Sequence, residues 1–196
     1  MSEPRFGSLR RSPKFSRLVC VVLAAPLILM GCSSMNDNSK TDGSAESKLG
    51  YKPDVRAVED AKGEVNAISS NLLDWMGVKG TVTESGAAVG VCEAIDPDLT
   101  KYYTIHHPWS IYKLSKGTFE TAIQNLRERL PKHGWDITKD GETKSQARNP
   151  EIVAVNRQTH HWVQIEWARE RSGKLEELIS VDVDSRCYLA PKGADL

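Results

Sequence analysis

An alternation of apolar and polar residues between positions 103 and 111 is the feature that most restricts the fold. The two interleaved sets are Tyr103, Ile105, His107, Trp109, Ile111 and Thr104, His106, Pro108, Ser110. Successive side chains of a strand point to opposite faces, so a period of two predicts a β-strand with one buried face. Pro108 has no N–H to donate to a neighbouring strand, and it therefore indicates an edge or a bulge.

Further strands are predicted on both sides of this segment. The last third of the chain contains four such segments, with the sequences GWDIT, EIVAVN, HHWVQIEWA and LEELISVDVDSRCYL. A strand or a hairpin is also predicted between Thr81 and Ile95, where Val, Ala and Gly are frequent.

Two other segments repeat apolar residues every three or four positions, which is the period of a helix. The first lies between Pro53 and Gly77, and the second between Phe119 and Gly134, with the glycines as stop signals. The combination predicts an α+β fold in which two helices pack on an antiparallel sheet of five or six strands. The expected order is α-β-β-α-β-β-β.

The first 31 residues have the organisation of an export signal. Residues 1–17 carry five basic side chains against one acidic side chain, and Leu18 to Met30 is uncharged. This run of 13 residues contains Pro26 and falls short of the roughly 20 residues of a membrane-spanning helix. A short apolar run before a small residue therefore favours a removable signal. An ordinary signal peptide with a chance cysteine and an uncleaved anchor are the alternatives.

The sequence Leu29-Met30-Gly31-Cys32 resembles the lipobox of bacterial lipoprotein precursors. Leu29, Gly31 and Cys32 match the pattern, while Met30 departs mildly from the small residue usual at its position. The resemblance implies signal cleavage between Gly31 and Cys32 and transfer of a diacylglyceryl group to the Cys32 thiol. The mature protein would then be held by this lipid at the extracytoplasmic face of the cell membrane.

The rest of the chain divides into a tether and one domain. Residues 32–50 comprise Cys32 and a serine-rich stretch without aromatic residues, which predicts a disordered tether. Residues 51–196 have the length of a single α+β domain. This domain is similar to the soluble domain of small actinobacterial surface lipoproteins of unknown function, in the helix before Gly134-Trp135 and in the late VDSRC sequence. That resemblance brings no catalytic residues.

Charge is unevenly distributed along the chain. Residues 32–196 hold 21 of the 26 basic and 25 of the 26 acidic residues, a net charge of −4. A nucleic-acid-binding domain would carry a basic patch, so nucleic acid is not an expected partner. Membrane attachment would depend on the Cys32 lipid alone.

Two cysteines remain in the predicted domain, and an exported protein favours their pairing. Cys92 and Cys187 are therefore expected to form a disulfide. The alternative, two free thiols in a metal or redox site, lacks the CxxC spacing that such sites use.

Histidines occur in two adjacent pairs, His106-His107 and His160-His161, each close to a tryptophan. Adjacent strand residues point to opposite faces, so each pair could supply only one ligand to a shared metal site. We therefore expect no metal site and no cofactor. His106 and His160 fall on the more polar faces, and together with Trp162 they form a candidate ligand surface.

Trp162 shares its face with Gln164 and Glu166, and an exposed tryptophan there could stack on a sugar ring or anchor a partner protein. We expect instead that the N-terminal helix covers it. Ser85 lies among small residues in TESGAAVG but lacks the glycine two positions before it that a nucleophile elbow requires. We expect a turn there and no catalytic residue in the chain.

These observations predict a non-enzymatic cell-envelope lipoprotein that acts as a binding or interaction module for an envelope protein. The alternative is an accessory lipoprotein that binds a small ligand or a metal through its His/Trp strands. An enzyme of unrecognised type is the third class.

Overall fold

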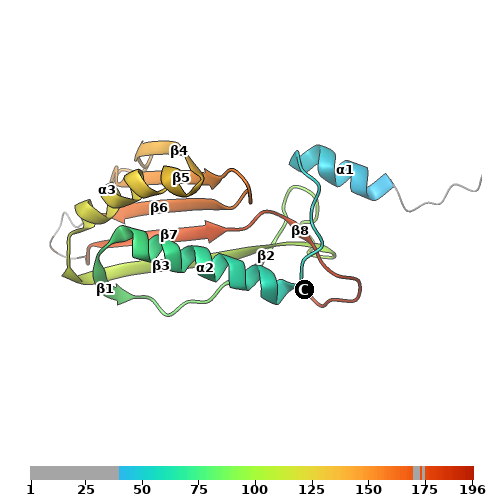
Figure 1. Ribbon diagram of the computed structural model, residues 1–196, viewed down its shortest axis with the longest axis horizontal. Helices are drawn as coiled ribbons and strands as arrows, with labels where there is room; N and C mark the ends of the chain where they lie inside the picture. The colour runs from blue at the N-terminus through green and yellow to red at the C-terminus, as the bar shows by residue number, and fades with distance from the viewer. Residues whose placement is uncertain (1–39, 170–172, 174) are drawn as a thin grey trace, which may run out of the picture. The chain divides into compact units, whose positions relative to one another are not determined.

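The computed structural model describes residues 40–169, 173 and 175–196. They form an α+β domain with a large antiparallel sheet (Figure 1). Leu29, Met30, Gly31, Cys32 and the predicted signal lie outside the described residues. No helix within residues 40–169 and 175–196 has the length and apolar character needed to cross a membrane.

The sheet has eight strands, all paired antiparallel. They are β1 (Lys79–Val82), β2 (Ala88–Val91), β3 (Tyr102–Lys116), β4 (Trp135–Glu142), β5 (Pro150–Asn156), β6 (Trp162–Ala168), β7 (Leu178–Asp184) and β8 (Tyr188–Leu189). The spatial order is β1-β3-β7-β6-β5-β4, and β2 and β8 also pair with β3. The α+β class and the antiparallel sheet are confirmed.

The numbers of elements differ from the prediction of two helices and five or six strands. The described residues contain three α-helices, α1 (Lys40–Leu49), α2 (Val58–Met76) and α3 (Phe119–Arg129), and a short 3-10 helix at Pro131–His133. Helix α1 occupies part of the predicted tether. The segment 81–95, predicted as a strand or a hairpin, contains the end of β1 and all of β2, which do not pair with each other. The last predicted segment is divided into β7 and β8, so the order of elements is also different.

Helices α2 and α3 lie over the same face of the sheet (Figure 1). The apolar stripe of α2 is fully buried at Ala61, Val65, Leu72 and Met76, because it faces the alternating apolar residues of the strands. Gly77 adopts a left-handed conformation and ends α2, as the sequence predicts.

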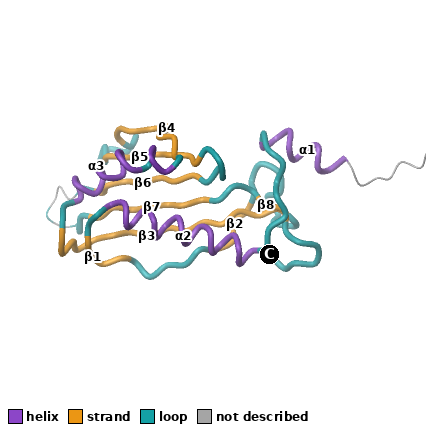
Figure 2. Tube along the Cα trace, viewed as in Figure 1, coloured by secondary structure: helices purple, strands orange, loops and turns teal. Residues whose placement is uncertain are grey.

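Pro108 lies where the outer side of β3 has no partner strand. Strand β1 pairs with β3 up to the Val82–Ile111 position, and β2 pairs from the Ala88–His106 position. Residues 107–110 face the irregular connection between β1 and β2, which is drawn as a teal loop in Figure 2. The missing N–H therefore costs no ladder hydrogen bond, and the local edge that Pro108 predicts is present.

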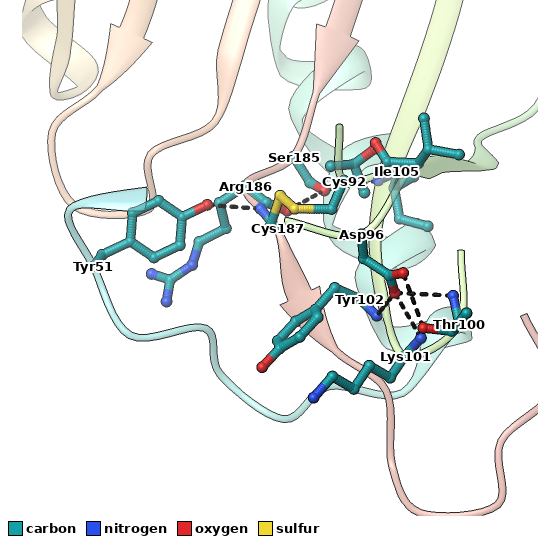
Figure 3. Close-up of a disulfide and its surroundings, with 12 residues drawn as sticks. Tyr51, Cys92, Asp96, Thr100, Lys101, Tyr102, Ile105, Ser185, Arg186 and Cys187 are labelled. Atoms are coloured by element: carbon teal, nitrogen blue, oxygen red, sulfur yellow. Dashed lines mark hydrogen bonds between the residues drawn. A yellow bond between two sulfur atoms is a disulfide. The ribbon is translucent and has the colours of Figure 1, made fainter. Parts of the chain in front are cut away.

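Cys92 and Cys187 form the predicted disulfide (Figure 3). It joins the end of β2 to the approach to β8, and its cysteines pack with Tyr102 and with Ala45 of α1 in a small second cluster. The covalent bond thus ties the approach to β8 to the end of β2, next to the start of β3, and α1 packs against this cluster through Ala45.

Candidate functional site

The candidate site is a row of three side chains across three adjacent strands, on the sheet face opposite to α2 and α3. His106 of β3 pairs with Asp184 of β7, and Asp184 pairs with Trp162 of β6. Asp182 and Gln164 form the next pair on the same face. We call His106, Trp162, Gln164, Asp182 and Asp184 the open-face cluster.

The alternation of burial shows which face these residues occupy. Val163 and Val183 have no exposed surface and face the helices, whereas the neighbouring Trp162 and Asp184 are half-buried. Trp162 therefore points away from α2, and the expectation that the N-terminal helix covers it is wrong. The strand register sets the orientation, since the apolar side chains of β6 must face the core.

The imidazole of His106 lies between two carboxylates. Its Nδ1 atom is 2.8 Å from Oδ1 of Asp184, and its Nε2 atom is 3.7 Å from Oδ1 of Asp182. The side chains are 42%, 30% and 38% exposed for His106, Asp184 and Asp182. Water screens such charges, so the arrangement orients side chains more than it stabilises the fold.

Asp182 has a perturbed acidity. Burial raises the pKa of its carboxyl above the ordinary value of 3.8, His106 opposes that shift, and the negative charge of Asp184 adds to it. The cluster thus presents two carboxylates beside one imidazole and one indole, and its acidic character favours a partner that brings positive charge or hydrogen-bond donors.

His160, the third residue of the predicted ligand surface, lies elsewhere. It sits in the turn before β6 with a positive φ of 56°, and its ring stacks on Tyr51 with centroids 5.4 Å apart. The left-handed backbone takes it out of the strand alternation on which its assignment depended. The structure therefore brings together His106 and Trp162 and leaves His160 outside.

The second histidine of each pair, His107 or His161, lies on the helix-covered side of the sheet. His107 is buried, with its Nδ1 atom 2.8 Å from Oγ of Ser69, and His161 has no exposed surface. Among the described residues, no group of three or more His, Cys, Asp or Glu side chains is arranged to hold a metal ion.

Ser85 lies closer to a histidine than the sequence suggests. Its Oγ atom is 3.5 Å from Nε2 of His107, but its hydroxyl donates to the carbonyl oxygen of Pro108 at 2.6 Å. The Nε2 atom is also 3.3 Å from the carbonyl oxygen of Ser85, to which an Nε2–H donates. These hydrogen bonds hold the connection between β1 and β2 against β3.

Asp182 and Asp184 are not among the site residues predicted from the sequence, although both contact His106. The alternation around Val181 and Val183 places both carboxylates on the polar face, but only the strand order puts β3 beside β7. Comparisons with protein-family models, curated proteins and solved structures find no match to this chain.

Proposed function

We propose that this protein is a lipid-anchored bacterial cell-envelope lipoprotein, and that its folded domain is a non-enzymatic interaction module that binds a partner protein through the open-face cluster. The anchor is the lipid on Cys32, and the domain lies on the extracytoplasmic side of the membrane. The partner-binding function is assigned to the sheet face that carries the open-face cluster.

The anchor is supported by the sequence Leu29-Met30-Gly31-Cys32 at the end of a short apolar run. The thiol of Cys32 is the nucleophile that a lipid transfer requires. One acyl chain gives only marginal membrane binding, and a diacylglyceryl group supplies the second chain that stable anchoring needs. The Cys92–Cys187 disulfide agrees with an oxidising compartment.

The binding face is supported by one observation above the others. Trp162 stands half-buried beside Asp184 on a sheet face that α2 and α3 leave free, next to the His106 carboxylate pair. Tryptophan is enriched among the residues that dominate binding energy, because its large ring loses little conformational entropy. The carboxylates of Asp182 and Asp184 favour a partner surface with lysine or arginine side chains.

The anchor is tested by fractionation of cells that express the Cys32→Ala variant. We expect the variant to leave the membrane fraction or to remain unprocessed, and to lose labelling by an alkyne-tagged fatty acid. Cys20→Ala, in the same apolar run, is the matched control and should behave as the wild type. Unchanged membrane attachment and unchanged mass of Cys32→Ala would refute the anchor.

The face is tested by a photo-crosslinking amino acid placed at Trp162 of the full chain in cells. We expect a defined protein adduct, and we expect the double variant Asp182→Asn/Asp184→Asn to weaken it. The matched control places the same group at Trp75, a half-buried tryptophan of α2 on the opposite side of the sheet. Identical adducts from both positions, or none from Trp162, would contradict the proposed face.

A further inference from the structure

A cavity of about 300 Å³ lies on the helix-covered side of the sheet, between α2 and the connection from β1 to β2. Its walls include Ser69 and Ser70 of α2 and Ser85 of the connection, and His107 and Trp109 of β3 also line it. This volume is at the lower end of the range for small-molecule sites in proteins. None of the five residues belongs to the open-face cluster.

The inner wall consists of buried polar side chains. Ser69 and His107 are only 5% and 8% exposed, and they hydrogen-bond to each other at 2.8 Å. Burial lowers the pKa of His107 below 6.5, so its imidazole is neutral at neutral pH. Buried polar groups with fixed partners hold their positions without a ligand, which reduces the entropy cost of binding.

The outer wall is fastened to β3 by hydrogen bonds. The N–H of Thr83 donates to the carbonyl oxygen of Ser110 at 3.0 Å, and the N–H of Ser110 donates to Oγ1 of Thr83 at 2.9 Å. Ser85 donates to the carbonyl oxygen of Pro108 at 2.6 Å. The cavity is therefore largely preformed, although its outer wall is a connection without regular secondary structure.

The side chains that line the cavity are uncharged, and most of them can form hydrogen bonds. The polar lining side chains are Asn66, Ser69, Ser70, Thr83, Ser85 and His107. Among the described residues around this cavity, no Lys, Arg, Asp or Glu contributes to the lining. Because the Ser70 and Ser85 hydroxyls donate to protein carbonyl groups, they offer acceptor lone pairs, and the acceptor Thr83 keeps a free O–H.

The remaining surface is apolar and comes from Leu73, Val82 and Trp109. The Nε1 atom of Trp109 is buried without a hydrogen-bond partner. A guest with an apolar side and several groups that both donate and accept hydrogen bonds matches this lining.

We propose that this cavity binds an uncharged polyhydroxylated molecule of the size of one saccharide residue. Each hydroxyl group of such a molecule donates and accepts, as the mixed lining requires, and its C–H groups suit the apolar part of the wall. A charged group bound there would gain no ion pair from the lining residues. This inference does not depend on the proposed function, because the cavity and the open-face cluster lie on opposite faces of the sheet.

The test uses the full chain in a detergent without a sugar headgroup. Glucose, mannose, galactose and N-acetylglucosamine are added separately up to about 50 mM. This concentration saturates a site with a millimolar dissociation constant, which corresponds to about 4 kcal/mol of binding free energy. The readout is the indole N–H resonance of Trp109, assigned with Trp109→Phe. We expect at least one sugar to shift it saturably, and glucuronate and glucosamine to bind at least tenfold more weakly than their neutral counterparts.

Asn66→Phe places a large side chain at an exposed lining position of α2, and should reduce the shift at least tenfold. Ser70→Leu is the second blocking variant, in case the first fails to fold. Asn71→Phe is the matched control, since it changes an exposed asparagine of the same helix that does not line this cavity. No saturable shift with any neutral sugar, preferential binding of the charged sugars, or binding unaffected by either blocking variant would overturn the proposal.

Discussion

The Nδ1 atom of His106 lies 2.8 Å from Oδ1 of Asp184, the residue directly opposite to it on β7. The same ring reaches Asp182 only at 3.7 Å. The two carboxylates therefore differ in the strength of their contact with the His106 ring. Asp184 has a close hydrogen-bonding partner, whereas Asp182 combines partial burial with a negative neighbour.

Asp182→Asn should raise the free energy of unfolding at neutral pH, by up to about 0.5 kcal/mol because the group is partly exposed. Burial raises the pKa of Asp182 in the folded state, so the folded protein binds this proton more tightly than the unfolded chain. Ionised Asp182 thus costs stability once the pH exceeds its folded pKa. Urea unfolding at pH 7 and pH 3 measures the difference, which should disappear at the lower pH.

Asp184→Asn is the matched control for Asp182→Asn, since it removes the closer partner of His106 and should lower stability slightly. A loss of equal size in both variants would show that the contact between His106 and Asp182 outweighs the burial of that carboxylate.

The sequence predicts much of the fold because periodicity is a local property. The stripe of α2, the alternation of β3 and the stop at Gly77 all follow from residues close in the chain. Pro108 even predicts a local edge, although β3 has partner strands on both sides elsewhere. The sequence does not predict helix α1 because its composition is that of a tether, and Ala45 is buried among residues distant in sequence, in the cluster of Cys92, Tyr102 and Cys187.

The candidate site depends on information that local patterns do not contain. His106 and Trp162 could each be placed on a polar face, but they meet only because β7 lies between β3 and β6. The two histidine–carboxylate contacts join residues 76 and 78 positions apart, and the strand order decides them. The expected position of His160 extends the alternation two residues beyond the start of β6, where a left-handed backbone ends it.

Gly63→Ala and Gly80→Ala should have opposite effects on stability. Gly63 lies inside α2, and an added Cβ would meet no atom within 4 Å, so alanine should stabilise the helix by about 0.5–1 kcal/mol. At Gly80 the Cβ would lie 2.6 Å from the carbonyl oxygen of Tyr112, and β1 must shift. Thermal unfolding measures both changes. A stabilised Gly80→Ala variant would mean that β1 yields without cost.

Asp96→Ala should cost about 3 kcal/mol, because one buried carboxylate organises the turn before β3 (Figure 3). Its Oδ2 atom accepts from the N–H groups of Thr100, Lys101 and Tyr102 at 2.7–2.9 Å, and its Oδ1 atom accepts from the Thr100 hydroxyl at 2.9 Å. Chemical unfolding measures the loss. Asp98→Ala changes an exposed residue of the same turn and should stay within about 0.5 kcal/mol of wild type.

Reduction of the Cys92–Cys187 disulfide should lower the free energy of unfolding by about 4–5 kcal/mol. The cysteines are 95 residues apart in sequence, so the bond removes much of the freedom of the unfolded chain. Urea unfolding with and without dithiothreitol measures the effect. The double variant Cys92→Ala/Cys187→Ala should match the reduced protein and show no response to dithiothreitol. A reduced protein as stable as the oxidised one would contradict the chain-entropy account.

Stability should fall as the pH drops below the ordinary histidine pKa of 6.5, and His161 should carry part of that slope. Burial is the largest cause of its lowered pKa. Glu64 opposes the shift, while Arg186 and Arg56 reinforce it. Both ring nitrogens of His161 are buried without a hydrogen-bond partner, so the folded state accommodates the neutral ring better than the imidazolium.

The loss of stability at low pH follows from proton binding by the unfolded chain. Below pH 6.5 the unfolded chain takes up a proton that folded His161 resists, and the stability present above that pH is lost as the pH falls towards the folded pKa. One histidine contributes at most about 1.4 kcal/mol per pH unit. His161→Leu should flatten the dependence of the unfolding free energy on pH, measured by urea titration between about pH 5 and pH 7.5.

The matched control is His160→Asn, at the exposed neighbour whose positive φ of 56° asparagine tolerates. It should keep the wild-type slope. His107 is also buried with a lowered pKa, so His161→Leu should retain part of the slope and the double variant His107→Gln/His161→Leu should retain less. A wild-type slope in His161→Leu would show that the ring of His161 gains its proton in the folded state as easily as in the unfolded chain.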